Sequence, residues 1–122
     1  MKIIYFVFII IVLFSCSNKN NNKLNSKPIE YKVFEGDFIY LMDSSYFIDY
    51  NTSSNFQIAS EGEYYNLENE FLSFNFEEPV KVYLKVEGYL EDREGIEKNS
   101  IETFLIVTKI IGFDTNRTMS LL

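Results

Sequence analysis

Residues 80–90 read VKVYLKVEGYL, and apolar side chains alternate with polar ones along this stretch. Successive side chains of a β-strand point to opposite faces, so the alternation gives the strand one apolar and one polar face. The apolar set is Val80, Val82, Leu84, Val86 and Leu90, and the polar set is Lys81, Tyr83, Lys85, Glu87 and Tyr89. The stretch therefore predicts a strand with one face in a core and the other in water.

Four other segments have the composition of strands, namely residues 31–43, 46–50, 55–59 and 103–113. Gly36 interrupts the first of them and predicts a bulge or a bend. The last is β-branched and almost continuously apolar, which is typical of a strand that is buried on both faces or closes a barrel.

Between the third and fourth of the five predicted strands, residues 55–59 and 80–90, the period of the pattern changes. Ser60 and Glu63 have the spacing of a capping box, and Tyr64, Leu67, Phe71 and Leu72 then fall at helical spacing. We therefore predict a short amphipathic helix, followed by a loop that ends at Pro79.

The order β-β-β-α-β-β predicts a mainly β protein with an OB-fold-like barrel, which is a five-stranded Greek-key barrel with one short helix between strands 3 and 4. A lipocalin-like half-barrel, the alternative, would have more strands in succession and no such helix. We place the barrel domain at residues 29–114 and a C-terminal tail at residues 115–122.

The first 15 residues have the features of a lipoprotein signal peptide. Lys2 is basic, and the apolar run of residues 3–14 is too short to span a bilayer. The run ends in Leu13-Phe14-Ser15-Cys16, which resembles a bacterial lipobox, although Phe14 departs from it. We predict that Cys16 is lipidated (palmitate and related acyl chains), because the alternatives, an ordinary signal peptide or an uncleaved anchor, leave a lone thiol in an oxidising compartment.

Residues 16–28 predict a tether between the lipidated Cys16 and the domain. They are rich in Asn, Ser and Lys and have almost no apolar side chains, a composition that predicts flexibility. Ser17 and Asn18 stand where Asp would signal retention in the inner membrane, so by analogy with lipoprotein sorting we expect the outer membrane.

The charge of the domain restricts its partners. The whole chain has a net charge of −7, and residues 29–122 contain 7 Lys and Arg against 18 Asp and Glu. Such a surface repels phosphate backbones, which excludes nucleic acid and leaves cationic partners or simple solubility.

The residue types in the chain give little support for an enzymatic activity. The chain has no His, and its only Cys is the predicted lipidation site, so nucleophile–base pairs and N/S zinc sites are excluded. The acidic clusters Glu61-x-Glu63 and Glu91-Asp92-x-Glu94 do not have the spacing of an EF-hand. We predict no enzymatic activity, no metal site and no cofactor.

Four tyrosines are the candidate binding residues: Tyr83 and Tyr89 on the outer face of the predicted strand, and Tyr64 and Tyr65 on the helix, of which at least one should be outside. Aromatic side chains on an OB barrel stack on sugars or bases. The alternative is that they merely cover an amphipathic surface. The acidity of the domain favours a glycan or a protein as the ligand.

The run from Gly36 to Thr52, GDFIYLMDSSYFIDYNT, resembles the first half of the C-terminal OB domain of NlpE-type envelope lipoproteins. That family has Gly-x-Tyr-x-Tyr, Ala-Asp-Ala-Ala and Phe-x-Asp-Cys-x-Thr-Gly there. Later pieces also match: Ile58-Ala59, Leu67-Glu68, Phe71-Leu72, Pro79-Val80 and Val86-Glu87-Gly88. The resemblance covers most of residues 36–108.

The resemblance implies the partner-facing module of a system for envelope stress signalling, copper tolerance or surface sensing through a membrane kinase. Two departures limit it. The chain has no room for the preceding small barrel with its Cys-x-x-Cys, and Tyr50 stands where the family has Cys, so disulfide-based redox sensing is not carried over.

Together these features predict a non-enzymatic, lipid-anchored envelope lipoprotein that docks on another envelope protein or senses stress. The alternative is a binder of soluble ligands, either a cationic protein in the manner of small lysozyme inhibitors or an oligosaccharide.

Overall fold

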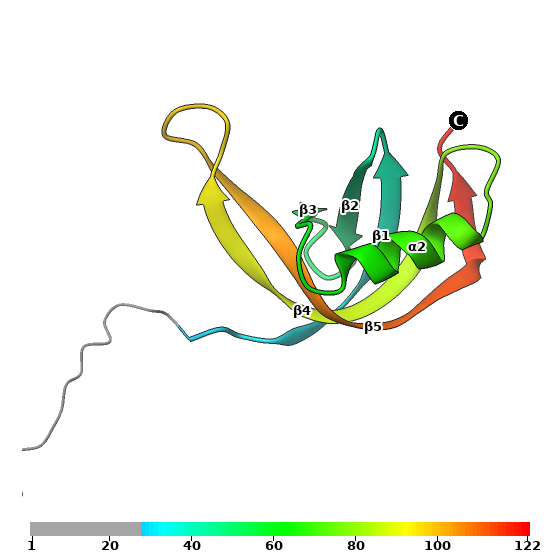
Figure 1. Cartoon of the computed structure of the whole chain (residues 1–122), viewed down its shortest axis with the longest axis horizontal. Coiled ribbons are helices and arrows are strands. Elements are labelled where there is room, and N and C mark those ends of the chain that lie inside the picture. Colours follow the sequence, from blue (N-terminus) through cyan, green and yellow to red (C-terminus); the bar gives the residue numbers. More distant parts are fainter. Residues whose placement is uncertain (1–27) are drawn as a thin grey trace, which may run out of the picture.

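The computed structural model describes residues 28–122 (Figure 1). Its elements are the strands β1 (Lys32–Leu41), β2 (Ser44–Asp49) and β3 (Asn55–Ile58), the helix α2 (Tyr64–Ser73), and the strands β4 (Val80–Glu94) and β5 (Ile101–Ser120). The predicted signal peptide, the lipidation of Cys16 and nearly all of the tether lie outside the described residues.

The five strands form a closed barrel in the order β1-β2-β3-β5-β4. All neighbouring strands are antiparallel except β3 and β5, which pair in parallel. The barrel and the single helix between β3 and β4 confirm the predicted OB fold. The pairing of β5 with both β3 and β4 also confirms that the apolar C-terminal strand closes the barrel.

The inward face of β4 supplies much of the core. Val80, Val82, Leu84 and Val86 are buried as the alternation predicts. Leu90 is an exception, because 36% of its surface is exposed. The pairing of β1 with β4 ends at Gly88, and beyond it β4 continues with β5 as a hairpin that projects from the barrel (Figure 1). Leu90 therefore lies outside the closed core.

The helix lies across one end of the barrel and buries Tyr64, Leu67 and Phe71 (Figure 1). Leu72, expected on the same stripe, is exposed. The predicted capping box is wrong: the helix begins after Glu63, and no side chain caps it. Instead, the backbone N–H of Glu63 donates a 2.8 Å hydrogen bond to the carbonyl of Val107 in β5. The barrel thus satisfies one of the donors at the helix start.

Gly36 lies within β1, and its register with both neighbouring strands is regular, so the predicted bulge does not occur there. It pairs with Asp49 in β2 and with Leu84 in β4, so β1 bonds to both neighbours there. A Cβ atom at this position would overlap the carbonyl oxygen of Ile48. Only glycine permits this close approach of the two strands.

The predicted C-terminal tail is wrong, because β5 continues to Ser120, which pairs with Val80. The pairing is interrupted between Asp114, opposite Tyr83, and Thr118, opposite Val82. Residues 115–117 have no partner on β4 and form a bulge. This polar segment lacks the alternation of a strand, which is why the sequence pattern ended at Phe113.

In the part of the chain from residue 28 onward, no helix has both the length and the apolar character that crossing a bilayer requires.

Candidate functional site

The structure separates the two tyrosines of the helix. Tyr64 is only 4% exposed, and its hydroxyl shares a 3.1 Å hydrogen bond with that of Ser45. It is a core residue, so its assignment as a binding residue is wrong. Tyr65 is exposed, as expected for at least one of the pair.

Tyr83 and Tyr89 lie on the outer face of β4, both half-buried, but in different surroundings. The ring of Tyr89 meets that of Tyr31 edge to face, with centroids 5.4 Å apart. The ring of Tyr83 lies 6.1 Å from that of Tyr50. The four predicted tyrosines therefore do not form one stacking surface.

Tyr50 and Tyr83 belong to a polar cluster on the outer face of β1 and β4. Tyr50 donates a 2.6 Å hydrogen bond to Asp37, and Tyr83 donates one of 2.9 Å to Glu35. Burial and the bond to Asp37 raise the pKa of Tyr50 to about 12. Burial and the bond to Glu35 raise the pKa of Tyr83 as well. Both side chains are therefore neutral phenols at physiological pH.

The acidic clusters have partners within the fold. Arg93 contacts Glu61 at 2.7 Å and Glu91 at 2.8 Å, and these two bonds raise the pKa of the guanidinium. Asp92 accepts a 2.7 Å hydrogen bond from Thr103. Across residues 28–122, no three side chains of the metal-binding types come together.

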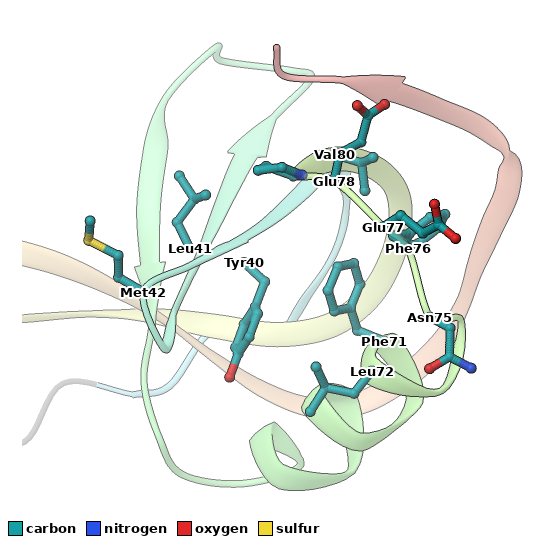
Figure 2. Close-up of a pocket in the computed structure, with 11 residues that line it drawn as sticks. Tyr40, Leu41, Met42, Phe71, Leu72, Asn75, Phe76, Glu77, Glu78 and Val80 are labelled. Atoms are coloured by element: carbon teal, nitrogen blue, oxygen red, sulfur yellow. The ribbon is translucent and has the colours of Figure 1, made fainter.

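A cleft of about 450 Å³ lies beside the end of the helix (Figure 2). We call it the helix-end cleft. One wall is the end of β1 with the turn that follows it, and the other is the last turn of α2 with the loop to β4. Its lining comprises Tyr40, Leu41, Met42, Phe71, Leu72, Asn75, Phe76, Glu77, Glu78, Pro79 and Val80.

The walls of the cleft are mostly apolar and well fixed. Phe71 is buried at its floor and packs against Tyr40, with ring centroids 5.7 Å apart. The Tyr40 hydroxyl donates a 2.7 Å hydrogen bond to Glu68, which ties the end of β1 to the helix and raises the pKa of Tyr40. Leu41 and Leu72 add exposed apolar surface at the two sides.

Met42 is an almost fully exposed apolar side chain of the cleft, at 95%. It and Asp43 form the two-residue turn between β1 and β2, and both have positive φ, 52° and 65°. Such a type I′ turn favours Asn, Asp and Gly, and methionine there is strained. An exposed apolar side chain on a strained turn is a feature that often marks a functional position.

The rim of the cleft is acidic. From Ala59 to Val80 the chain has six Glu and no Lys or Arg. Glu77 and Glu78 line the cleft, and both are exposed (Figure 2). The C-terminal end of α2, which has no basic residue in its last turn, adds a partial negative charge. The cleft therefore suits a ligand that is both apolar and cationic.

Sequence reasoning did not find this cleft. The run of Glu is visible in the sequence, but only the fold brings Met42 and Leu72 to opposite sides of one hollow.

The described residues 28–122 thus form an OB-fold barrel domain with an open surface cleft beside its helix. The family model for the NlpE C-terminal OB domain matches residues 28–119. The chain therefore belongs to the NlpE C-terminal OB domain family, as its sequence resemblance predicts. This family is not a known class of enzyme, and its membership indicates a protein of the cell envelope.

The chain is also similar to a solved structure, the crystal structure of the Cpx pathway activator NlpE from Escherichia coli. The TM-score is 0.57 at 23% sequence identity, and the match covers 82% of this chain and 52% of that one. The chain thus corresponds to about half the length of the solved protein, and the similarity supports the fold. A search of curated proteins finds no match.

Proposed function

We propose that this chain is a non-enzymatic, lipid-anchored lipoprotein of the outer membrane whose barrel docks on another envelope protein as an interaction or stress-sensing module. The predicted lipidation of Cys16 supplies the anchor, and the predicted tether of residues 17–28 connects the anchor to the barrel. Membership of the NlpE C-terminal OB domain family supports the envelope location. The similarity to NlpE, an activator of the Cpx pathway, supports a signalling role.

The helix-end cleft carries the proposal. Its apolar walls and acidic rim suit a segment of the partner in which basic side chains flank apolar ones. Apolar side chains would enter between Met42 and Leu72, and basic ones would meet Glu77 and Glu78. The same chemistry supports the second candidate, a soluble cationic protein of the kind that small lysozyme inhibitors bind.

Site-specific photo-crosslinking in intact cells tests the docking. A photoreactive residue in place of Met42 should yield a defined adduct with one envelope protein. The matched control is Ile96 in the loop between β4 and β5, which is 96% exposed and does not line the cleft. This loop lies on the opposite side of the view from the last turn of α2 (Figure 1). Equal adducts at both positions, or none at Met42, would remove the proposal.

A charge-neutral variant tests the role of the rim. Glu77→Gln with Glu78→Gln should weaken the Met42 adduct, whereas Glu94→Gln with Glu97→Gln on the hairpin should leave it unchanged. Purified lysozyme separates the two candidates. Binding to lysozyme that requires Glu77 and Glu78 and persists at 0.15 M salt, where the Debye length is about 8 Å, supports the soluble cationic ligand.

A further inference from the structure

A second cavity lies on the outer face of the barrel and shares no lining residue with the helix-end cleft. It has a volume of about 250 Å³ and is lined by Asp37, Tyr50, Lys81, Asn116, Arg117, Thr118 and Met119. We call it the Arg117 pocket. Neither the family resemblance nor the proposed docking accounts for it, and its role is independent of the proposed function.

The bulge in β5 builds this pocket. Residues 115–117 have no partner on β4, and two local hydrogen bonds shape the bulge. The backbone N–H of Asn116 donates to Asp114 at 3.0 Å, and the hydroxyl of Thr118 donates to the carbonyl of Thr115 at 2.7 Å. A bulge redirects side chains relative to a regular strand, and here it brings Arg117 over β4.

Arg117 is held in place by aromatic rings. Its guanidinium carbon lies 3.9 Å from the ring centroid of Tyr83 and 5.9 Å from that of Tyr50. Both rings are fixed by the hydrogen bonds of their hydroxyls to Glu35 and Asp37. A guanidinium that stacks on a ring keeps its N–H donors available at its edge.

The nearby carboxylates are engaged elsewhere. Asp37 pairs with Lys81 at 3.7 Å and accepts the Tyr50 bond, and Glu35 pairs with Lys85 at 4.0 Å. Within residues 28–122, Arg117 takes part in no ion pair, in contrast to Arg93 with its two glutamates. A prearranged guanidinium that forms no ion pair within the described residues thus lines a cavity.

We infer that the Arg117 pocket binds a carboxylate group. The guanidinium fork matches the two oxygens of a carboxylate, and the side chains of Asn116 and Lys81, which line the same pocket, offer further donors. Lys81 and Arg117 against Asp37 give the lining one net positive charge, which suits a single negative charge better than the double charge of a phosphate. The carboxylate can come from a polypeptide C-terminus or from a free small acid.

NMR titration of the ¹⁵N-labelled full-length protein in detergent tests the inference, with the Arg117 Nε–Hε signal as readout and the Arg93 signal as internal reference. Acetate and N-acetylalanine should shift the Arg117 signal saturably, and N-acetylalanine amide should not. Tighter binding of N-acetylalanine than of acetate identifies a polypeptide terminus, and equal or weaker binding identifies a small free acid. No saturable shift with either carboxylate, or tighter binding of inorganic phosphate, overturns the inference.

Three variants make the test specific. Arg117→Gln should abolish carboxylate binding. Arg93→Gln removes the same positive charge elsewhere and should leave binding intact. Asp37→Asn should tighten binding several-fold, because it removes the one negative charge in the lining. Weaker binding of the carboxylates in Asp37→Asn would contradict this electrostatic expectation and would also overturn the inference.

Discussion

The hydroxyl of Tyr50 and the carboxylate of Asp37 lie 2.6 Å apart, and this bond joins the end of β2 to the middle of β1. The bond requires Tyr50 to keep its proton, because an ionised phenolate would face the carboxylate without a shared hydrogen. Burial and Asp37 together raise the pKa of Tyr50 from 10.0 to about 12.

The stability of the fold should therefore fall at alkaline pH. In the unfolded chain Tyr50 ionises near its ordinary pKa, whereas in the folded protein it stays neutral until about pH 12. The contribution of this group is complete below pH 10 and is lost as the pH rises toward 12. Urea denaturation at pH 9 to 12 measures the effect. Tyr50→Phe should show a shallower decline than the unchanged protein, and identical slopes would contradict the assignment.

Relief of the strained turn should stabilise the protein. Met42→Asn places at a positive φ a residue that tolerates it, and we expect a gain of about 0.5–1 kcal/mol in the free energy of unfolding. The same variant should lose the Met42 contact with a docking partner. Thermal unfolding followed by circular dichroism measures the first effect. As a control, Ile96→Asn should change stability by less than about 0.5 kcal/mol.

The position of Gly36 in β1 should tolerate no side chain. Gly36→Ala forces a methyl group against the carbonyl of Ile48, and overpacking of this kind costs about 1–3 kcal/mol. Val33→Ala, on the exposed outer face of the same strand, provides the comparison and should cost less than about 0.5 kcal/mol. Chemical denaturation measures both. An equal loss in the two variants would contradict the close approach of the strands.

Removal of the last segment should destabilise the barrel. Deletion of residues 115–122 strips β4 of the partners of Val80 and Val82, both of which are buried. Exposure of one such valine costs at least about 1.5 kcal/mol. Deletion of only residues 121–122, which lie beyond β5, should have little effect. Comparison of the two melting temperatures decides whether the segment is a strand or a tail.

The alternating pattern of β4 and the helical pattern of α2 predicted most of the fold. Val82, Leu84 and Val86 on one face of β4 and Leu67 and Phe71 on one face of α2 have a periodicity that depends only on local geometry, so it can be recognised in the sequence. The same reasoning failed at residues 115–120. There β5 crosses a bulge, and a bulge breaks the period on which strand prediction relies.

The candidate sites were less predictable for a related reason. Tyr64 and Tyr65 are chemically alike, and the rotation of the helix against the barrel alone decides which is buried. Arg117 and Tyr83 meet through the bulge, and Met42 and Leu72 meet across the end of the barrel. Such juxtapositions depend on contacts between residues about 30 positions apart, and no local pattern encodes them.

The position of β5 between β3 and β4 also governs when the barrel can form. The final strand of the chain is the one that joins its two sides, so a polypeptide that emerges with its N-terminus first has no closed core until Ser120 is free. Until then the segments before β5 lack the partner that joins β3 to β4, so closure of the core is a late step in folding.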